Sequence, residues 1–164
     1  MTDLGYVHYY LGIEATQYPK SIFLSQKKYI GDLLNKFGMT ECNPLTTPME
    51  QNLKLTSIEG KEFEDATKYR QLVGSLNNLT ITRPDISFAV GILSRFMQKP
   101  CEGHWSTAKR VLRYLKETQE FGIKYTQVDD FNLIGYSDLD FDGDKETGVS
   151  TSGYAISVGL RVVS

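Results

Sequence analysis

Apolar positions recur every three to four residues along four stretches of the chain, which is the spacing of amphipathic helices. The predicted helices cover residues 26–37, 68–82, 84–98 and 102–117. The second and third meet at the sequence TRPD. Arg83 precedes a proline and is therefore pushed out of the helical region, whereas Pro84 suits the first position of the next helix. The sequence predicts two helices joined by a rigid elbow.

The last of these helices has two distinct sides. Trp105, Leu112 and Leu115 fall on one side, which we expect to pack against the helix predicted over residues 84–98. The other side carries the basic stripe, which is the name used below for the side chains of Lys109, Arg113 and Lys116 at i, i+4 and i+7. A charged stripe on an amphipathic helix is usually its solvated face, but this spacing also suits contact with a track of phosphates.

Strand-forming residues flank the helical region. Aromatic and β-branched residues dominate positions 7–15 and 21–24, and a turn containing Pro19 lies between them, so a β-hairpin is predicted. Three more strand-like runs follow the last helix, at residues 121–126, 131–137 and 151–158. The chain is therefore predicted to have an α+β fold.

These elements divide the chain into four expected segments. They are a hairpin with a helix over residues 1–39, a linker over 40–66, a helical bundle over 67–118 and a strand-rich segment over 119–164. Two prolines and weak periodicity make the linker an extended segment that is not expected to pack.

The composition and net charge of the chain exclude only a few classes of function. A chain of 164 residues makes one or two domains, and a net charge of −2 gives no global attraction to nucleic acid or to acidic membranes. Cys42 and Cys101 lack metal-binding spacing and are expected to be free thiols in a reducing compartment, although one long-range disulfide stays open. No run approaches the roughly 20 apolar residues of a membrane helix. An intracellular protein is expected, in either the cytoplasm or the nucleus.

A cluster of carboxylates lies between the last two predicted strands, in the sequence SDLDFDGD. Asp138, Asp140 and Asp142 match the opening of an EF-hand calcium loop, but Val149 stands where a glutamate should close that loop. The other chemistry that uses several carboxylates is phosphodiester hydrolysis with two metal ions, which needs carboxylates from different strands and helices. A simple acidic turn is the third interpretation.

Several phrases of the sequence resemble, in the same order, the reverse transcriptases of copia-type retrotransposons. They are LGYVHYYLGIEA, IFLSQKKY, CNPLTTPM, LVGSLNNLTITRPDI, HWSTAKRVLRYLKET, and GYSDLDFDGD followed by STSGYAISVG. The resemblance covers nearly the whole chain, from about residue 3 to about residue 159. It departs from the family pattern where Glu117 replaces a glycine, where Gly148 and Val149 replace a basic pair, and after Gly159.

The resemblance implies a fold, partners and site residues. It implies a primer-grip hairpin, a three-helix bundle of the thumb and connection type, and the first strands of an incomplete RNase H-like sheet. Leu11, Gly12 and Ile13 would lie at the primer grip, and the basic stripe would contact an RNA–DNA hybrid or another duplex. Asp138 would be the first RNase H carboxylate, with Asp140 beside it as a possible ligand of Mg²⁺.

The resemblance also implies a piece of a larger enzyme. The parent activities are RNA-directed DNA polymerisation and hydrolysis of RNA–DNA hybrids, and the remainder of the polyprotein would be a partner. The polymerase's Tyr-Val-Asp-Asp and most RNase H carboxylates are not among these 164 residues, so we expect this piece to be inactive alone. Two alternatives are a non-catalytic nucleic-acid-binding remnant and a small divalent-metal-binding domain that uses the DLDFDGD loop.

Overall fold

The computed structural model describes residues 8–51, 53, 60–127, 133–140, 151–158 and 161–162. The chain divides into two compact units, one made of residues 1–16 and 23–123 and the other of residues 17–22 and 124–164. Across the described ranges, no helix is both long enough and apolar enough to cross a membrane.

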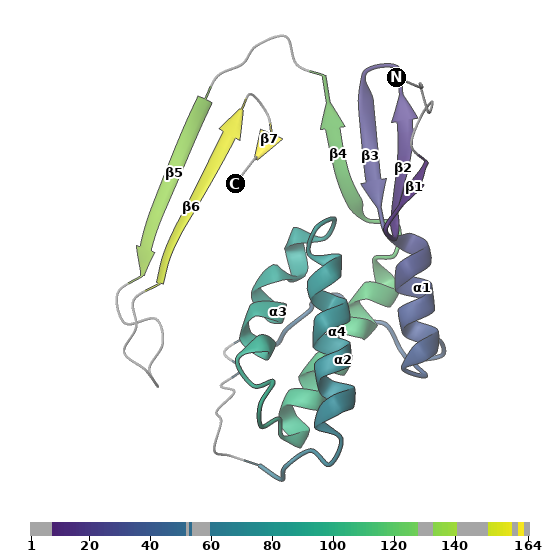
Figure 1. The fold of residues 1–164 in the computed structure, drawn as a ribbon, viewed down its shortest axis with the longest axis vertical. Helices are drawn as coiled ribbons and strands as arrows, with labels where there is room; N and C mark the ends of the chain where they lie inside the picture. Colours follow the sequence, from purple (N-terminus) through teal and green to yellow (C-terminus); the bar gives the residue numbers. More distant parts are fainter. Residues whose placement is uncertain are drawn as a thin grey trace. The chain divides into compact units, whose positions relative to one another are not determined.

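Helices and strands alternate in blocks along the chain (Figure 1). In order, the elements are β1 (Tyr9–Tyr10), β2 (Ile13–Tyr18), β3 (Ser21–Ser25), α1 (Lys27–Lys36), α2 (Ala66–Leu79), the 3-10 turn η1 (Pro84–Ile86), α3 (Ser87–Ser94), α4 (Glu102–Glu117), β4 (Gly122–Thr126), β5 (Leu133–Asp140), β6 (Thr151–Val158) and β7 (Arg161–Val162). The strands form one sheet in the order β1-β2-β3-β4 and a second in the order β5-β6-β7. The predicted α+β class is confirmed.

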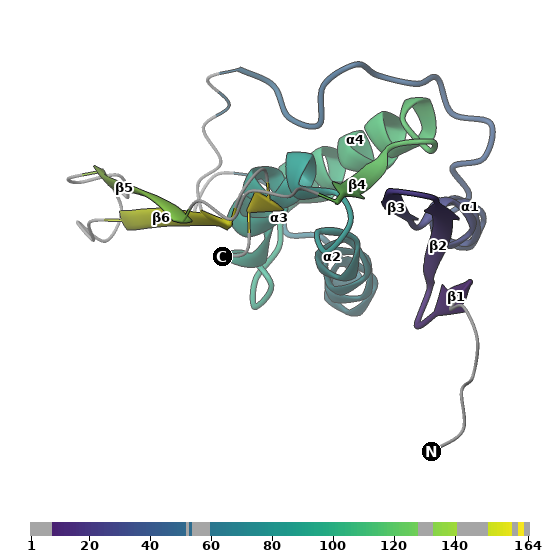
Figure 2. The same ribbon diagram turned by 90° about the horizontal axis from the view of Figure 1, so that it is seen from above.

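The helix α4 is the centre of the helical unit, because it contacts α1, α2 and α3 (Figure 2). Its apolar side is fully buried at Ala108, Val111, Leu112 and Leu115. Trp105 lies at the edge of this core and stacks on Phe63, with ring centroids 4.8 Å apart. The predicted burial is confirmed for Leu112 and Leu115, whereas Trp105 is only partly buried and packs on Phe63 instead of on the helix predicted over residues 84–98.

The predicted elbow is present between α2 and α3. Arg83 has φ −129° and ψ 69°, outside the helical region, and Pro84 occupies the first turn of η1. The helix expected over residues 84–98 is shorter than predicted, because it begins as this 3-10 turn and ends at Ser94.

The strand predicted over residues 7–15 is interrupted in the structure. Leu11 and Gly12 have φ values of 48° and 87°, so the chain turns there and β1 pairs back on β2, with Tyr10 opposite Ile13. Glycine adopts such a conformation readily, but a leucine in the left-handed region is uncommon. The apolar run that suggested one strand is thus two strands around a two-residue turn.

Arg83 joins the elbow to the end of α4 through a buried guanidinium group. Its side chain is 1% exposed, and its Nε and Nη2 donate to the two carboxylate oxygens of Asp85 at 2.9 and 2.7 Å. Its Nη1 donates to the carbonyl oxygen of Thr118 at 2.9 Å, directly after α4. A cation at this position also suits the negative end of the α4 dipole. The elbow and the end of α4 are therefore fixed to one another.

The carboxylate of Asp85 is the second half of this junction. Burial alone would raise the pKa of Asp85, but the hydrogen bonds from Arg83 and from the Tyr114 hydroxyl at 2.7 Å, together with the charge of Arg83, lower it. Burial and the hydrogen bond to Asp85 raise the pKa of Tyr114. Asp85 therefore stays ionised, with Tyr114 as a neutral donor.

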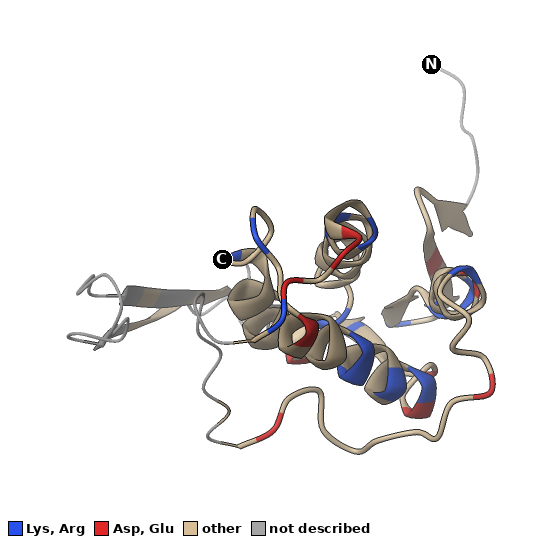
Figure 3. Ribbon diagram, turned by 90° about the horizontal axis from the view of Figure 1, so that it is seen from below, with Lys and Arg blue, Asp and Glu red and all other residues tan. Residues whose placement is uncertain are grey.

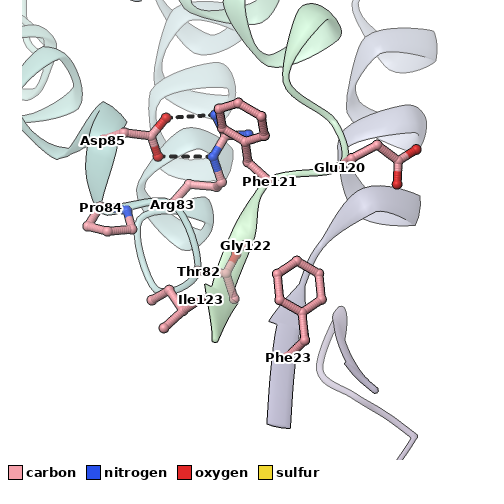
Figure 4. A pocket seen from close by; sticks show the side chains of 9 residues that line it. All are labelled: Phe23, Thr82, Arg83, Pro84, Asp85, Glu120, Phe121, Gly122 and Ile123. Atoms are coloured by element: carbon pink, nitrogen blue, oxygen red, sulfur yellow. Dashed lines mark hydrogen bonds and ion pairs between the residues drawn. The ribbon is translucent and has the colours of Figure 1, made fainter. Parts of the chain in front are cut away.

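A cleft of about 450 Å³ lies beside this junction, between η1 and the strands β3 and β4. Figure 4 shows the Arg83 guanidinium facing both oxygens of Asp85, with the Phe121 ring beside it. Phe23 and Pro84 line the cleft as well. Gly122 is needed where β4 meets β3, because a Cβ atom there would overlap the carbonyl oxygen of Leu24.

The second unit is a set of strands with regular antiparallel pairing. β5 pairs with β6 along its whole length, from Leu133 opposite Val158 to Asp140 opposite Thr151. β7 adds a short third strand next to β6. Asp138 lies opposite Gly153 and is within β5, one residue beyond the strand predicted over 131–137.

The buried face of α4 makes a prediction for stability. Leu112→Ala should lower the free energy of unfolding by about 2–5 kcal/mol, the usual cost of truncating a buried leucine, since Leu112 is fully buried. Chemical denaturation measures the effect. Ser106→Ala, at an exposed position of the same helix, is the matched control and should change little. An unchanged midpoint for Leu112→Ala would contradict the helix-face assignment.

The junction makes a prediction for pH dependence. The pKa of Asp85 is lowered on folding, so its ion pair stabilises the protein above the unfolded-state pKa of about 4. That stabilisation is lost as the pH falls through the lower folded-state pKa. At pH 7, Asp85→Asn should cost about 1–3 kcal/mol, less than a fully buried pair because Asp85 is 35% exposed. Denaturation between pH 7 and pH 2 should show this difference shrinking, and a constant difference would contradict the assignment.

Candidate functional site

The tip of the β1–β2 hairpin holds the three residues expected at a primer grip. Leu11 is 75% exposed, and Gly12 and Ile13 are partly buried. Gly12 has a φ of 87°, a backbone conformation that favours glycine. Contact of this tip with nucleic acid stays a prediction.

The basic stripe of α4 contacts the linker that precedes α2. We call residues 42–50 the strap. Lys116 Nζ donates to the carbonyl oxygen of Cys42 at 2.8 Å, and Arg113 Nε donates to that of Asn43 at 2.6 Å. In return, the backbone N–H of Leu45 donates to the carbonyl oxygen of Arg113 at 3.3 Å. The linker was expected to be extended and unpacked, but its strap portion is held along α4.

Arg110 extends the same row toward the other end of the strap. Its Nη1 donates to Glu50 Oε1 at 2.8 Å and its Nη2 to Thr47 Oγ1 at 3.0 Å. Its Nε is buried and has no hydrogen-bond partner among the described residues. Arg110, Arg113 and Lys116 therefore contact the strap in reverse sequence order, so the strap runs antiparallel to the helix.

The charges of the basic stripe are oriented by the strap but are not neutralised by it. Arg113 and Lys116 bind neutral carbonyl oxygens, and Lys109 Nζ lies 5.8 Å from the centre of the Trp105 ring. Within the described part of the chain, none of the three forms an ion pair with a carboxylate. In Figure 3, Lys and Arg segments recur along the C-terminal half of α4. Each of these side chains keeps donors that a phosphate oxygen can use.

The carboxylates expected to bind a metal are only partly described. Asp138 and Asp140 both lie within β5. Residues 141–150, which include Asp142 and Val149, lie outside the described residues. Where the structure describes the chain, no group of three or more His, Cys, Asp or Glu side chains could hold a metal ion. Two carboxylates on one strand do not by themselves fit a two-ion site.

The two cysteines are free thiols. Cys101 caps the start of α4: its backbone N–H donates to His104 Nδ1 at 3.0 Å, and its Sγ lies 3.2 Å from the same nitrogen. Cys42 lies beside Lys116 at the other end, about 24 Å away along a helix of 16 residues. The long-range disulfide left open by the sequence is not present.

Reasoning from the sequence missed two features of the structure. Arg110 was not included in the basic stripe, although residues 110, 113 and 116 recur every three residues and thus also share one side of a helix. Arg83 was seen only as a residue before proline. No pattern in the sequence indicated that the strap would bind α4.

Comparison with known proteins identifies relatives of this chain. The family described as "Reverse transcriptase (RNA-dependent DNA polymerase)" matches residues 1–51. The Pol polyprotein of transposon RE1 from Arabidopsis thaliana is 46% identical over 158 residues, which are 96% of this chain but 11% of that polyprotein. The Pol polyprotein of transposon TNT 1-94 from Nicotiana tabacum is 37% identical over 173 aligned residues, 13% of its length.

A shorter relative matches over the full chain. An uncharacterized mitochondrial protein of Arabidopsis thaliana is 39% identical over 164 residues, covering 100% of this chain and 68% of that protein. No solved structure matches. The chain thus spans about a tenth of the polyproteins it resembles, and the similarity to them extends over most of its length. The chain belongs to the family of copia-type retrotransposon Pol polyproteins, related to retroviral Pol.

Proposed function

We propose that this chain is the duplex-binding part of a copia-type reverse transcriptase, comprising the primer-grip hairpin, the thumb and connection helices, and the start of RNase H. Its partners are an RNA–DNA hybrid and the remainder of the polyprotein. The observation that carries the proposal is the basic stripe: Lys109, Arg113 and Lys116 lie on one helix, and no carboxylate in the described part of the chain pairs with them.

The electrostatics of this surface suit a phosphate backbone. A duplex is bound mainly through Lys and Arg contacts to its phosphates, which release condensed counterions. The strap oxygens that hold Arg113 and Lys116 are neutral, so the positive charges are oriented without being cancelled. The chain's net charge of −2 opposes binding. The affinity should therefore be in the range of about 10⁻⁴–10⁻⁶ M that is usual for non-specific binding.

The hairpin tip supplies a second contact in this proposal. Leu11 is strongly exposed although it is apolar, and it is held in a left-handed conformation that leucine rarely adopts. Such outliers often occur where a side chain is presented to a ligand. The tip would lie against the primer strand.

In this proposal, the second unit would supply only the first carboxylates of an RNase H active site. Reverse transcriptases generally use a divalent metal, and in this proposal Asp138 and Asp140 on β5 would be the first ligands of Mg²⁺. Hydrolysis with two ions needs further carboxylates from other elements. We therefore assign no step of that reaction to this chain alone.

The proposal predicts salt-dependent binding that requires the basic stripe. Changing Lys109, Arg113 and Lys116 together to Gln should weaken binding of an RNA–DNA hybrid and reduce the salt slope by roughly one unit for each lost contact. Fluorescence anisotropy at several salt concentrations measures both quantities.

A matched control distinguishes the effect of the basic stripe on binding from the effect of net charge. Changing Lys20, Lys36 and Lys99 to Gln removes the same charge at positions outside α4 and should leave the slope nearly unchanged. Because Arg113 and Lys116 also hold the strap, Lys109→Gln, which removes no strap contact, is compared with Lys99→Gln. Equal binding by the parent and the stripe variant, or no binding by either at low salt, would make the stripe a solvated face.

The proposal also predicts that these 164 residues have no polymerase activity by themselves. Primer extension needs metal-binding aspartates, and none of these residues matches the polymerase's Tyr-Val-Asp-Asp at the expected position. A primed RNA template incubated with the purified chain, nucleotides and Mg²⁺ or Mn²⁺ should show no extension. Extension that persists in the pure chain and is lost when the chain is removed would contradict the proposal.

A further inference from the structure

We infer that Glu50 competes with the phosphates of a bound duplex for Arg110, and so sets how many cations the α4 surface offers. This inference rests on the proposed function. The helix α4 carries four potential phosphate-binding cations, Lys109, Arg110, Arg113 and Lys116, and the last three of them contact the strap. Glu50 is the one carboxylate that pairs with any of them among the described residues.

The contacts of the strap divide into two kinds. Those to Arg113 and Lys116 end on backbone carbonyl oxygens, which cannot cancel a charge. The contact to Arg110 ends on a carboxylate, with Nη1 and Oε1 only 2.8 Å apart. Thr47 Oγ1 accepts from the other terminal nitrogen. Both outward nitrogens of Arg110, which together could bind a phosphate in bidentate fashion, are therefore already occupied.

This pairing is weak enough to be exchanged. Glu50 is 59% exposed at its side chain and Arg110 is 23% exposed, so water and salt screen the pair. Exposed pairs of this kind contribute about 0–1 kcal/mol. The buried Nε of Arg110 has no hydrogen-bond partner within the described ranges, so the described contacts do not satisfy the whole guanidinium group. A phosphate that carries a full negative charge and two available oxygens can accept the same two hydrogen bonds.

The position of Arg110 shows what its release would add. Residues 110, 113 and 116 are spaced three apart on α4 and contact consecutive parts of the strap. Arg110 therefore lies about one turn before Arg113, on the side of α4 that contacts the strap. Without Glu50, one more phosphate contact becomes available on the same track.

The test is Glu50→Gln, which keeps the size of the side chain and removes its charge. Binding of an RNA–DNA hybrid should become tighter at low salt, on the order of 3–10-fold, and the salt slope should increase by about one. The matched control is Glu41→Gln. Glu41 lies just before the strap, is exposed, and makes no ion pair within the described residues. This control makes the same change in net charge and should leave the slope unchanged.

A double variant assigns the gain to Arg110. Glu50→Gln combined with Arg110→Gln restores the net charge of the parent and should return the slope to the parent value. Circular dichroism and the unfolding midpoint confirm that each variant is folded. A gain that persists in the double variant would mean that Arg110 does not make the added contact, and would overturn the inference.

The outcomes separate this inference from the proposed function. If the parent binds through the basic stripe but Glu50→Gln behaves like Glu41→Gln, Glu50 does not compete for Arg110 and only the inference fails. If the parent does not bind, or binds equally well without the basic stripe, the proposed function fails and the inference fails with it.

Discussion

The helical unit depends on a charge that is almost entirely removed from water. An unpaired guanidinium group at 1% exposure would cost far more than a small domain can tolerate. Arg83 meets this requirement with four hydrogen bonds to Asp85 and Thr118, and its guanidinium carbon lies 5.5 and 5.4 Å from the ring centres of Tyr114 and Phe121. The groups that satisfy Arg83 come from η1, from α4 and from the segment before β4. The buried Arg83 guanidinium must be fully hydrogen-bonded. This requirement fixes the conformation of the elbow and the path of the chain directly after α4.

The part of this arrangement that is local in sequence could be predicted, and the rest could not. The periodicity of apolar residues identified all four helices, and proline chemistry identified the elbow, because both depend on neighbouring residues. The contact between Asp85 and Tyr114 joins residues 29 apart. Nothing in either local sequence distinguishes a buried arginine from the surface arginine that is more usual. The buried junction therefore became visible only in the structure.

The hairpin and the strap give two further examples of structure that could not be predicted from the local sequence. The run over residues 7–15 has the composition of one strand, and only Gly12 hinted at a turn, since leucine at position 11 opposes the left-handed conformation that it adopts. The prolines of the linker correctly indicated an extended chain. They could not indicate that α4 would bind that chain, because the contacts come from residues 60 to 74 positions away. For the basic stripe, helical spacing predicted where the charges lie but not which oxygens orient them.

The long separation of the strap contacts has a consequence for any attempt to reduce this surface to a peptide. A synthetic copy of α4 would carry the same cations at the same helical spacing, yet its lysine and arginine side chains would sample many rotamers in solution. In the folded chain, carbonyl oxygens of Cys42 and Asn43 restrict two of them. The charge of the surface is thus encoded within one helix, whereas its geometry comes from a loop that closes across more than a third of the protein.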